Sequence, residues 1–391
     1  MRTVAVAFAA LLGLLTAVTL SGCASDPVVS GTSRAPQPLD IGPDASAVLA
    51  MIQPDDGVQA VIDYIDSAQE TLDIAVYQFE PSFDALVEAL QGAQERGVRV
   101  RILLSGTIYP PTSPNGNPQD AQELRDLGLD AQLSRPEFSF SHWKMLIADG
   151  KTDGGSVLLC DFNLGPGYFG IDPAYPDEGE TRGMAVLDTN PVDVSLIQRT
   201  FDADWPPYSP WPANNSPRLV WSPSDATCDS PSCTMPGVSL EPVGNSRAAI
   251  TALIDSATAT LDVYVQAFAF PSQLLQPLLN ACTSGVAIRV LGNDGGINDE
   301  VLRSLSDCGA EVRWNTADPS GDGRVMYLHT KTIVADAGLP TGVAYVGSVN
   351  PFLDESVQTE RELGILITDP ASIDRIDSVF TRDFDAGSSA S

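Results

Sequence analysis

One block of sequence occurs twice in this chain, and the duplication limits the possible folds more than any other feature. Residues 65–79, IDSAQETLDIAVYQF, return as residues 254–268, IDSATATLDVYVQAF, 189 positions later. Solenoids repeat with periods of about 20–50 residues, so a period this long indicates a duplicated domain. The 391 residues are therefore predicted to form two similar domains.

Each copy carries the same order of helix and strand patterns. A helix leads into an apolar strand, and a second helix and a second strand follow. The predicted helices span 58–68, 83–96, 248–257 and 272–282, and the predicted strands span 72–77, 98–104, 261–265 and 286–291. Gly97 and Gly285 stand where helix C-caps belong. This alternation predicts an α/β fold whose βαβ units build mixed, largely parallel sheets.

A proline-rich stretch separates the two copies. Residues 206–218 include PPYSPWPANNSP, which suits neither a helix nor a central strand. We predict a linker here, with the first half at 46–205 and the second half at 219–387.

The chain contains two histidines, and they occupy the same place in the two copies. Each histidine is followed by a lysine after two residues and by an aspartate after seven, and an asparagine lies further on. The two sets, 187 positions apart, are His142, Lys144, Asp149 and Asn163, and His329, Lys331, Asp336 and Asn350. Alternation along a strand would place each histidine and its lysine on one face.

These residue types suit chemistry on a phosphodiester. Lysine ammonium groups and asparagine amides can hold the anionic oxygens and stabilise charge as it moves. A neutral imidazole can attack phosphorus, while a second, protonated imidazole can protonate the leaving alcohol. The pattern needs no metal and no other cofactor, and the sequence offers no metal-ligand cluster.

The doubled His-x-Lys-x4-Asp pattern, with Gly347-Ser348-Val349-Asn350 completing the second copy, resembles the phospholipase D superfamily over about residues 50–387. The resemblance implies two α/β/α domains about a pseudo-twofold axis, with their sheets packed near the interface and both histidines in one cleft. It also implies that His142 is the nucleophile and His329 the general acid and base. Which histidine has which role stays open on the residues alone.

The resemblance further assigns roles to the surrounding groups. Lys144, Lys331, Asn163, Asn350 and Ser348 would bind the phosphate. An acidic residue downstream of each asparagine would orient the histidine of the opposite half, and the candidates are Glu180, Glu360 and Glu362. Asp149 and Asp336 would be structural. The expected substrate is a phosphodiester, favoured as a phospholipid head group, with hydrolysis or transphosphatidylation as the outcome.

The first copy departs from this pattern at one position. Cys160-Asp161 stands where the second copy has Gly347-Ser348. A carboxylate that faced the phosphate would repel it and could neutralise Lys144. The loop could turn Asp161 away, the site could take an unusual substrate, or the first half could be impaired.

The first residues resemble a bacterial lipoprotein signal. An apolar run without charge, residues 4–20, ends at Leu20-Ser21-Gly22-Cys23. We predict a signal peptide over 1–23 with lipidation of Cys23, a flexible tether over 24–45, and an extracytoplasmic protein anchored to the cell membrane by lipid. The alternative is an uncleaved membrane anchor.

An exported chain is expected to form disulfides. We predict the pairs Cys228–Cys233 and Cys282–Cys308, which leave Cys160 as a buried free thiol. The loose cysteine spacing argues against a zinc site.

The net charge of −30 argues against tight nucleic-acid binding, which normally uses a basic surface. Two other functions stay open. One is a metal-independent nuclease of the same superfamily, and the other is a non-catalytic phosphate-binding lipoprotein, which Asp161 keeps in consideration. Because one chain supplies both histidines, a monomer is expected.

Overall fold

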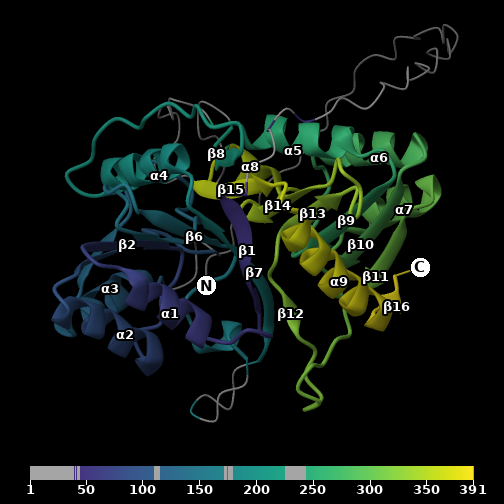
Figure 1. Cartoon of the computed structure of the whole chain (residues 1–391). Helices are drawn as coiled ribbons and strands as arrows, with labels where there is room; N and C mark the ends of the chain where they lie inside the picture. Colours follow the sequence, from purple (N-terminus) through teal and green to yellow (C-terminus); the bar gives the residue numbers. More distant parts are fainter. Residues whose placement is uncertain are drawn as a thin grey trace, which may run out of the picture. The chain divides into compact units, whose positions relative to one another are not determined.

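Two eight-stranded β-sheets form the frame of the protein (Figure 1). The structure is a computed structural model and describes residues 39, 41, 45–109, 115–170, 174, 179–224 and 244–390. The predicted signal peptide, almost all of the tether, Cys23 and the predicted Cys228–Cys233 pair lie outside the described residues. Within the described part, no helix is long and apolar enough to cross a membrane.

The first sheet has the strand order β1-β7-β6-β5-β2-β3-β4. Its strands are β1 (Ala47–Gln53), β2 (Thr71–Val76), β3 (Arg99–Leu104), β4 (Asp130–Leu133), β5 (Met145–Ala148), β6 (Ser156–Cys160) and β7 (Thr181–Asp188). A short strand from the second half, β12 (Tyr327–Leu328), pairs with β7 and completes this sheet.

The second sheet repeats this order as β8-β15-β14-β13-β9-β10-β11, and β16 adds to β11 at the edge. Its strands are β8 (Leu219–Ser222), β9 (Thr260–Val265), β10 (Ala287–Gly292), β11 (Glu311–Trp314), β13 (Thr332–Ala335), β14 (Val343–Gly347), β15 (Glu362–Ile367) and β16 (Ser388–Ser389). The sheets are mixed, as predicted. Parallel pairing joins β2, β3 and β4, likewise β9, β10 and β11, and also β12 and β7. The other strand pairs are antiparallel.

The helices follow the strands in the same order in both halves. They are α1 (Gln59–Ser67), α2 (Asp84–Glu95), α3 (Asn117–Asp126), η1 (Pro166–Tyr168), α4 (Pro191–Asp204), α5 (Ser246–Ser256), α6 (Leu275–Thr283), α7 (Asp299–Cys308), α8 (Asp354–Gln358) and α9 (Pro370–Ala386). The buried faces of α1, α2 and α3 complete one core with the first sheet. Those of α5, α6 and α7 complete another core with the second sheet.

The predicted helix and strand pairs of each repeat are present within a few residues. Gly97 and Gly285 have φ values of 94° and 95°, a left-handed conformation that suits glycine at a helix end. The predicted disulfide Cys282–Cys308 joins the end of α6 to the end of α7. Cys160 is buried with a free thiol.

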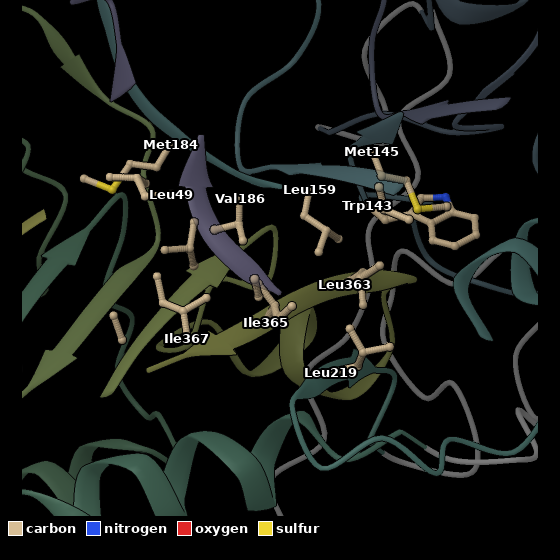
Figure 2. Close-up of a cluster of buried hydrophobic side chains, with 14 of the residues drawn as sticks. Leu49, Trp143, Met145, Leu159, Met184, Val186, Leu219, Leu363, Ile365 and Ile367 are labelled. Carbon is tan, nitrogen blue, oxygen red and sulfur yellow. The ribbon is translucent and has the colours of Figure 1, made fainter. Parts of the chain in front are cut away.

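A third core lies between the two sheets and packs the halves together (Figure 2). Leu49, Met145, Leu159 and Val186 come from the first sheet, and they meet residues of the second sheet. The second-sheet members drawn in Figure 2 are Leu219, Leu363, Ile365 and Ile367. Because this core is continuous, it fixes the inner faces of the two sheets against each other.

Main-chain pairing also crosses between the halves at the residues next to the histidines. β12 pairs in parallel with the start of β7, so that Leu328 opposes Arg182. At the equivalent place in the second sheet, Ser141 forms a parallel bridge with Arg361, the residue just before β15. The N–H of His142 then donates to the carbonyl of Arg361 at 2.8 Å, and the N–H of His329 donates to the carbonyl of Arg182 at 3.1 Å. Each histidine backbone is thus held by the opposite half.

Two buried ion pairs link the halves in the same reciprocal way. Arg182 on β7 donates from Nε to Asp383 on α9 at 2.8 Å. Arg361, just before β15, donates from Nε to Asp204 on α4 at 2.9 Å. All four side chains are at least 90% buried. We call these the two Arg–Asp latches.

Candidate active site

The histidines and lysines lie outside the strands, in the residues just before β5 and β13. Our expectation that alternation along a strand would align them needs correction, since neither pair belongs to a strand. Instead, each lysine folds back over its own histidine. The ammonium of Lys144 donates to the main-chain carbonyl of His142 at 2.5 Å, and that of Lys331 donates to the main-chain carbonyl of His329.

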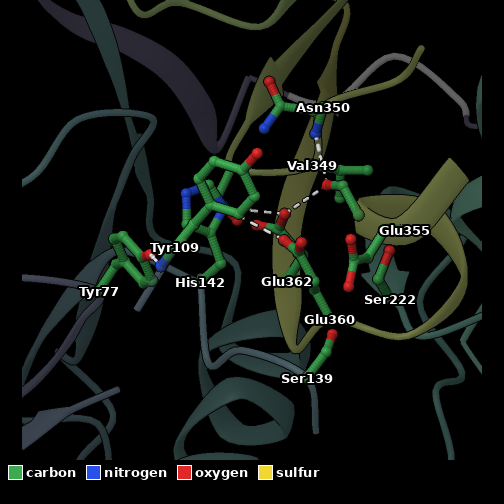
Figure 3. A network of polar contacts seen from close by, with 12 residues as sticks. Tyr77, Tyr109, Ser139, His142, Ser222, Val349, Asn350, Glu355, Glu360 and Glu362 are labelled. Atoms are coloured by element: carbon green, nitrogen blue, oxygen red, sulfur yellow. Dashed lines mark hydrogen bonds and ion pairs between the residues drawn. The ribbon is translucent and has the colours of Figure 1, made fainter. Parts of the chain in front are cut away.

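His142 points at two carboxylates from the second half (Figure 3). Its Nδ1 lies 2.9 Å from Glu362 Oε1 and 3.7 Å from Glu360 Oε2. Ser356 also donates to Glu362 Oε1, at 2.5 Å. The Nδ1–H bond to Glu362 leaves Nε2 with its lone pair. Burial lowers the pKa of His142 to about 4, although Glu362 acts in the opposite direction.

The two glutamates carry different charges. Burial and the neighbouring Glu362 raise the pKa of Glu360 well above its usual value. For Glu362, burial would raise the pKa, but His142 and Lys144 outweigh it and the net shift is downward. Two carboxyl groups this close do not both ionise easily. Glu362 is therefore the carboxylate beside His142, and Glu360 keeps its proton to a higher pH than an ordinary glutamate does.

Replacement of Glu360 with Gln is expected to change how stability depends on pH. Because its folded-state pKa is raised, wild-type Glu360 stays protonated above pH 4.5, where the unfolded chain has lost that proton. The contribution of Glu360 to stability is therefore full at low pH and declines as pH rises, by about 1.4 kcal/mol per unit until the folded-state pKa is passed. Glutamine does not titrate, so E360Q should gain stability relative to wild type between pH 5.5 and 7.5.

Urea unfolding at both pH values measures this difference. Glu95→Gln on the exposed face of α2 is the control and should leave the pH dependence unchanged. An E360Q protein whose stability runs parallel to wild type across the range would show that Glu360 is ionised in the folded state.

His329 has a different environment from His142. Its Nδ1 lies 3.0 Å from the ammonium of Lys331, and a ring N–H donates to the main-chain carbonyl of Asp161. The Tyr168 ring meets it edge-on, with centroids 5.3 Å apart. Burial and the charges of Lys331, Lys144 and His142 lower its pKa well below the usual value. The charges of Lys144 and His142, from the other half of the chain, thus act on His329 as well.

The lysines and asparagines line the same region. Burial lowers the pKa of Lys144 to about 8, against the effect of Glu362, and lowers that of Lys331 further. Asn163 donates to the Tyr168 hydroxyl at 3.0 Å, and the Asn350 N–H donates to Ser356 Oγ at 2.8 Å. Among the described residues, neither asparagine Oδ1 has a hydrogen-bond partner. A water molecule or a ligand hydroxyl can donate to these oxygens.

The other candidates from the sequence accept hydrogen bonds from main-chain N–H groups. Glu180 was a candidate to orient His329, but its carboxylate accepts from the N–H of Ser320 on the loop before β12. Asp149 accepts main-chain N–H bonds from residues 69, 70 and 71, and Asp336 does the same for residues 258, 259 and 260. Asp149 thus fixes the turn that leads into β2, and Asp336 fixes the turn that leads into β9. Ser348 Oγ accepts from the N–H of Leu363 at 3.0 Å.

Sequence reasoning missed the arginines that support the site. Arg182 and Arg361 each hold a histidine through their main-chain carbonyl and bind an aspartate across the interface through their side chain. The signal was present, since an arginine follows closely after Glu180 and after Glu360 and an aspartate occurs in both FDADW and FTRDF. Tyr77 was missed as well. Its ring meets His142 edge-on, with centroids 4.7 Å apart.

Only one group of side chains in the described residues could hold a metal ion, and it belongs to this site. Ligand atoms of His142, Glu360 and Glu362 lie within 4.8 Å of one another. The chemistry considered below needs only the protein's own groups: a carboxylate-bound imidazole, a second imidazole, two ammonium groups and two amides.

Comparison with known proteins places this geometry in a family. The family model described as cardiolipin synthase, PLD-like domain, matches residues 61–205 and again residues 250–384. No curated protein sequence matches the chain.

Solved structures share the fold at low identity. The phosphatidylserine synthase of Haemophilus influenzae Rd KW20 has a TM-score of 0.58 at 12% identity, and the match covers 90% of this chain and 89% of that one. The polyphosphate kinase of Porphyromonas gingivalis has a TM-score of 0.56 at 15% identity over 86% of this chain, which spans 50% of that kinase. Because the family model matches both halves and more than half of the residues, the chain belongs to the cardiolipin synthase family of phospholipase D-like domains, with one such domain in each half.

Proposed function

We propose that the protein is a phosphodiesterase or phosphatidyltransferase that acts on the head group of a phospholipid through a phosphohistidine at His142. The observation that carries the proposal is the pairing of His142 Nδ1 with the buried carboxylate of Glu362. Attack by Nε2 on phosphorus turns the imidazole into a cation, and a carboxylate on the other nitrogen stabilises that cation.

The reaction would proceed in two displacements. Nε2 of His142 forms a bond to phosphorus, the bond from phosphorus to the leaving oxygen breaks, and a protonated His329 gives one proton to that oxygen and becomes the neutral imidazole. His329 then takes a proton from water or an alcohol, whose oxygen attacks phosphorus while the phosphorus–nitrogen bond breaks. Hydrolysis and transfer differ only in the acceptor.

The charges in the site support a monoanionic diester as the substrate. Lys144 and Lys331 provide two buried positive charges, and Glu362 and Asp161 provide two carboxylates beside them. A site whose two ammonium groups are matched by two carboxylates suits one negative charge better than a polyphosphate or a nucleic-acid backbone, which bring many. The net charge of −30 acts in the same direction.

Two comparisons support a phospholipid. The description of the family names cardiolipin synthase, and one solved structure with the same fold is a phosphatidylserine synthase. The predicted lipid anchor at Cys23 would also bring the site to a membrane surface.

A trapped intermediate tests the function. Vesicles that contain phosphatidylglycerol labelled with ³²P are mixed with the protein and quenched in alkali, which preserves phosphohistidine. We expect labelled protein together with phosphatidic acid, or with a transphosphatidylated product when an alcohol is added. His142→Ala should give neither. Label and product at wild-type levels in His142→Ala would exclude the mechanism, and the absence of turnover in wild type would favour a phosphate-binding protein.

The lipid anchor makes a separate prediction. Expression of the full chain in bacteria grown with radiolabelled palmitate should yield a labelled protein in the membrane fraction. Cys23→Ser should abolish the label, because the thiol is the attachment point. A Cys23→Ser protein that still fractionates with membranes would favour the uncleaved anchor.

A further inference from the structure

The two halves do not carry their acidic group at the same position. In the second half, Cα pairing of β14 with β15 sets Gly347 opposite Gly364. In the first half, pairing of β6 with β7 sets Cys160 opposite Ala185. Since Cys160 corresponds to Gly347, this register makes Gly183 the counterpart of Glu362. The main-chain bonds from His142 to Arg361 and from His329 to Arg182 agree with it. His329 therefore lacks the glutamate that orients His142.

The first half carries its carboxylate on a neighbouring loop instead, at Asp161. Asp161 corresponds to Ser348, and both side chains accept a hydrogen bond from a main-chain N–H of the neighbouring strand. Asp161 Oδ1 accepts from the N–H of Met184 at 2.8 Å, and Ser348 Oγ accepts from the N–H of Leu363 at 3.0 Å. The second half combines Glu362 on the strand with serine on the loop, whereas the first half combines Gly183 on the strand with aspartate on the loop.

Steric contacts show what keeps residue 183 a glycine. A Cβ on Gly183 would lie 2.7 Å from Phe162 Cδ1, 3.0 Å from Phe162 Cβ and 3.0 Å from Asp161 Oδ1. A glutamate at 183 would therefore meet both the Phe162 ring and the Asp161 carboxylate. The second half has the smaller Val349 and Ser348 at these two positions, beside Glu362.

Asp161 interacts with both His329 and Lys331. The side chain is fully buried, and its Oδ2 has no hydrogen-bond partner among the described residues. Its main-chain carbonyl accepts from the His329 ring. Burial raises the pKa of its carboxyl to about 6, against the charge of Lys331, which favours the ionised form. The carboxylate can balance the lysine charge that otherwise disfavours protonation of His329.

We propose that Asp161 is the positioning residue for His329 and Lys331, in place of the carboxylate that position 183 lacks. The inference rests on the proposed function for its kinetic consequences. Asp161 is then neither a defect nor a group turned away from the site. It holds His329 through its carbonyl and offsets the charge of Lys331 through its side chain.

Removal and relocation of the carboxylate test the proposal with diester turnover and inorganic phosphate binding as readouts. Asp161→Asn keeps the shape and loses the charge, so kcat should fall about 10- to 100-fold. The affinity for phosphate should rise, because Lys331 loses its counter-charge. Asp161→Ser should behave alike. The triple variant Asp161→Ser/Phe162→Val/Gly183→Glu copies Ser348, Val349 and Glu362 of the second half, and it should recover kcat relative to Asp161→Ser/Phe162→Val.

Two results would overturn the proposal. One is an unchanged kcat and phosphate affinity in Asp161→Asn. The other is a triple variant that folds, by its melting temperature, but is no more active than Asp161→Ser/Phe162→Val. If wild type turns over no phosphodiester, the proposed function fails by itself. Asp161 is then judged by phosphate affinity alone, where a tighter site in Asp161→Asn supports its role and an unchanged site refutes it.

Discussion

Replacement of His329 with Ala is expected to separate the two steps of the reaction. The variant keeps His142 and its bond to Glu362, so Nε2 can still attack phosphorus. It loses the group that protonates the leaving oxygen and later activates water. General acid and base catalysis contributes about 10²- to 10⁴-fold, so turnover of an alkyl phosphodiester should fall by that factor.

An activated leaving group needs no proton, and it makes the separation visible. With bis(p-nitrophenyl) phosphate, His329→Ala should release a burst of one p-nitrophenol per protein and then stall as the phosphoenzyme. His142→Ala is the matched control, because it removes the other imidazole and should release no burst. The reverse result, with a burst in His142→Ala and none in His329→Ala, would exchange the two roles.

The asymmetry behind this prediction could not be read from the sequence. The duplication and the residue types identified both histidines, both lysines and both asparagines. The two imidazoles have different partners because of the residues that β7 and β15 place beside them, and these depend on how β7 pairs with β6 and β15 with β14. Asn163 precedes Gly183 by 20 residues, whereas Asn350 precedes Glu362 by 12. The longer loop in the first half hides this equivalence, and it made Glu180 look like the counterpart of Glu360.

An insertion hides another equivalence in the same way. β1 and β8 take the same place in their sheets, and Gln53 opposes Gly183 as Ser222 opposes Glu362. Yet β8 is followed by about 20 more residues than β1 before the next helix, so the offset of the repeat changes there. Short apolar strands also carry too little pattern to be recognised without that offset. The long repeated segments, by contrast, fixed the helices and the parallel strands within a few residues.

Loss of one Arg–Asp latch is expected to produce the largest change in stability. In Arg361→Met, Asp204 stays at 1% exposure without its main cation. Removal of one partner from a buried ion pair costs about 3–5 kcal/mol of unfolding free energy, because the other charge stays desolvated. The arginine also stacks on Trp143 and Trp221, each about 5.0 Å from its guanidinium carbon, and methionine replaces that contact only in part. Urea unfolding measures the cost.

A matched variant and a double-mutant cycle separate the latch from a general effect of arginine removal. Arg96 pairs with Asp66 at 2.8 Å, but both side chains are at least 40% exposed, so Arg96→Met should cost no more than about 1 kcal/mol. Asp204→Asn in the Arg361→Met background removes the stranded charge and should restore part of the lost stability. An equal cost for Arg361→Met and Arg96→Met would mean that the nearby Arg135, 3.7 Å from Asp204, takes over the charge. The main-chain carbonyl of Arg361 also holds His142. If the pair with Asp204 fixes this residue in place, Arg361→Met should lose activity at temperatures below its own unfolding transition.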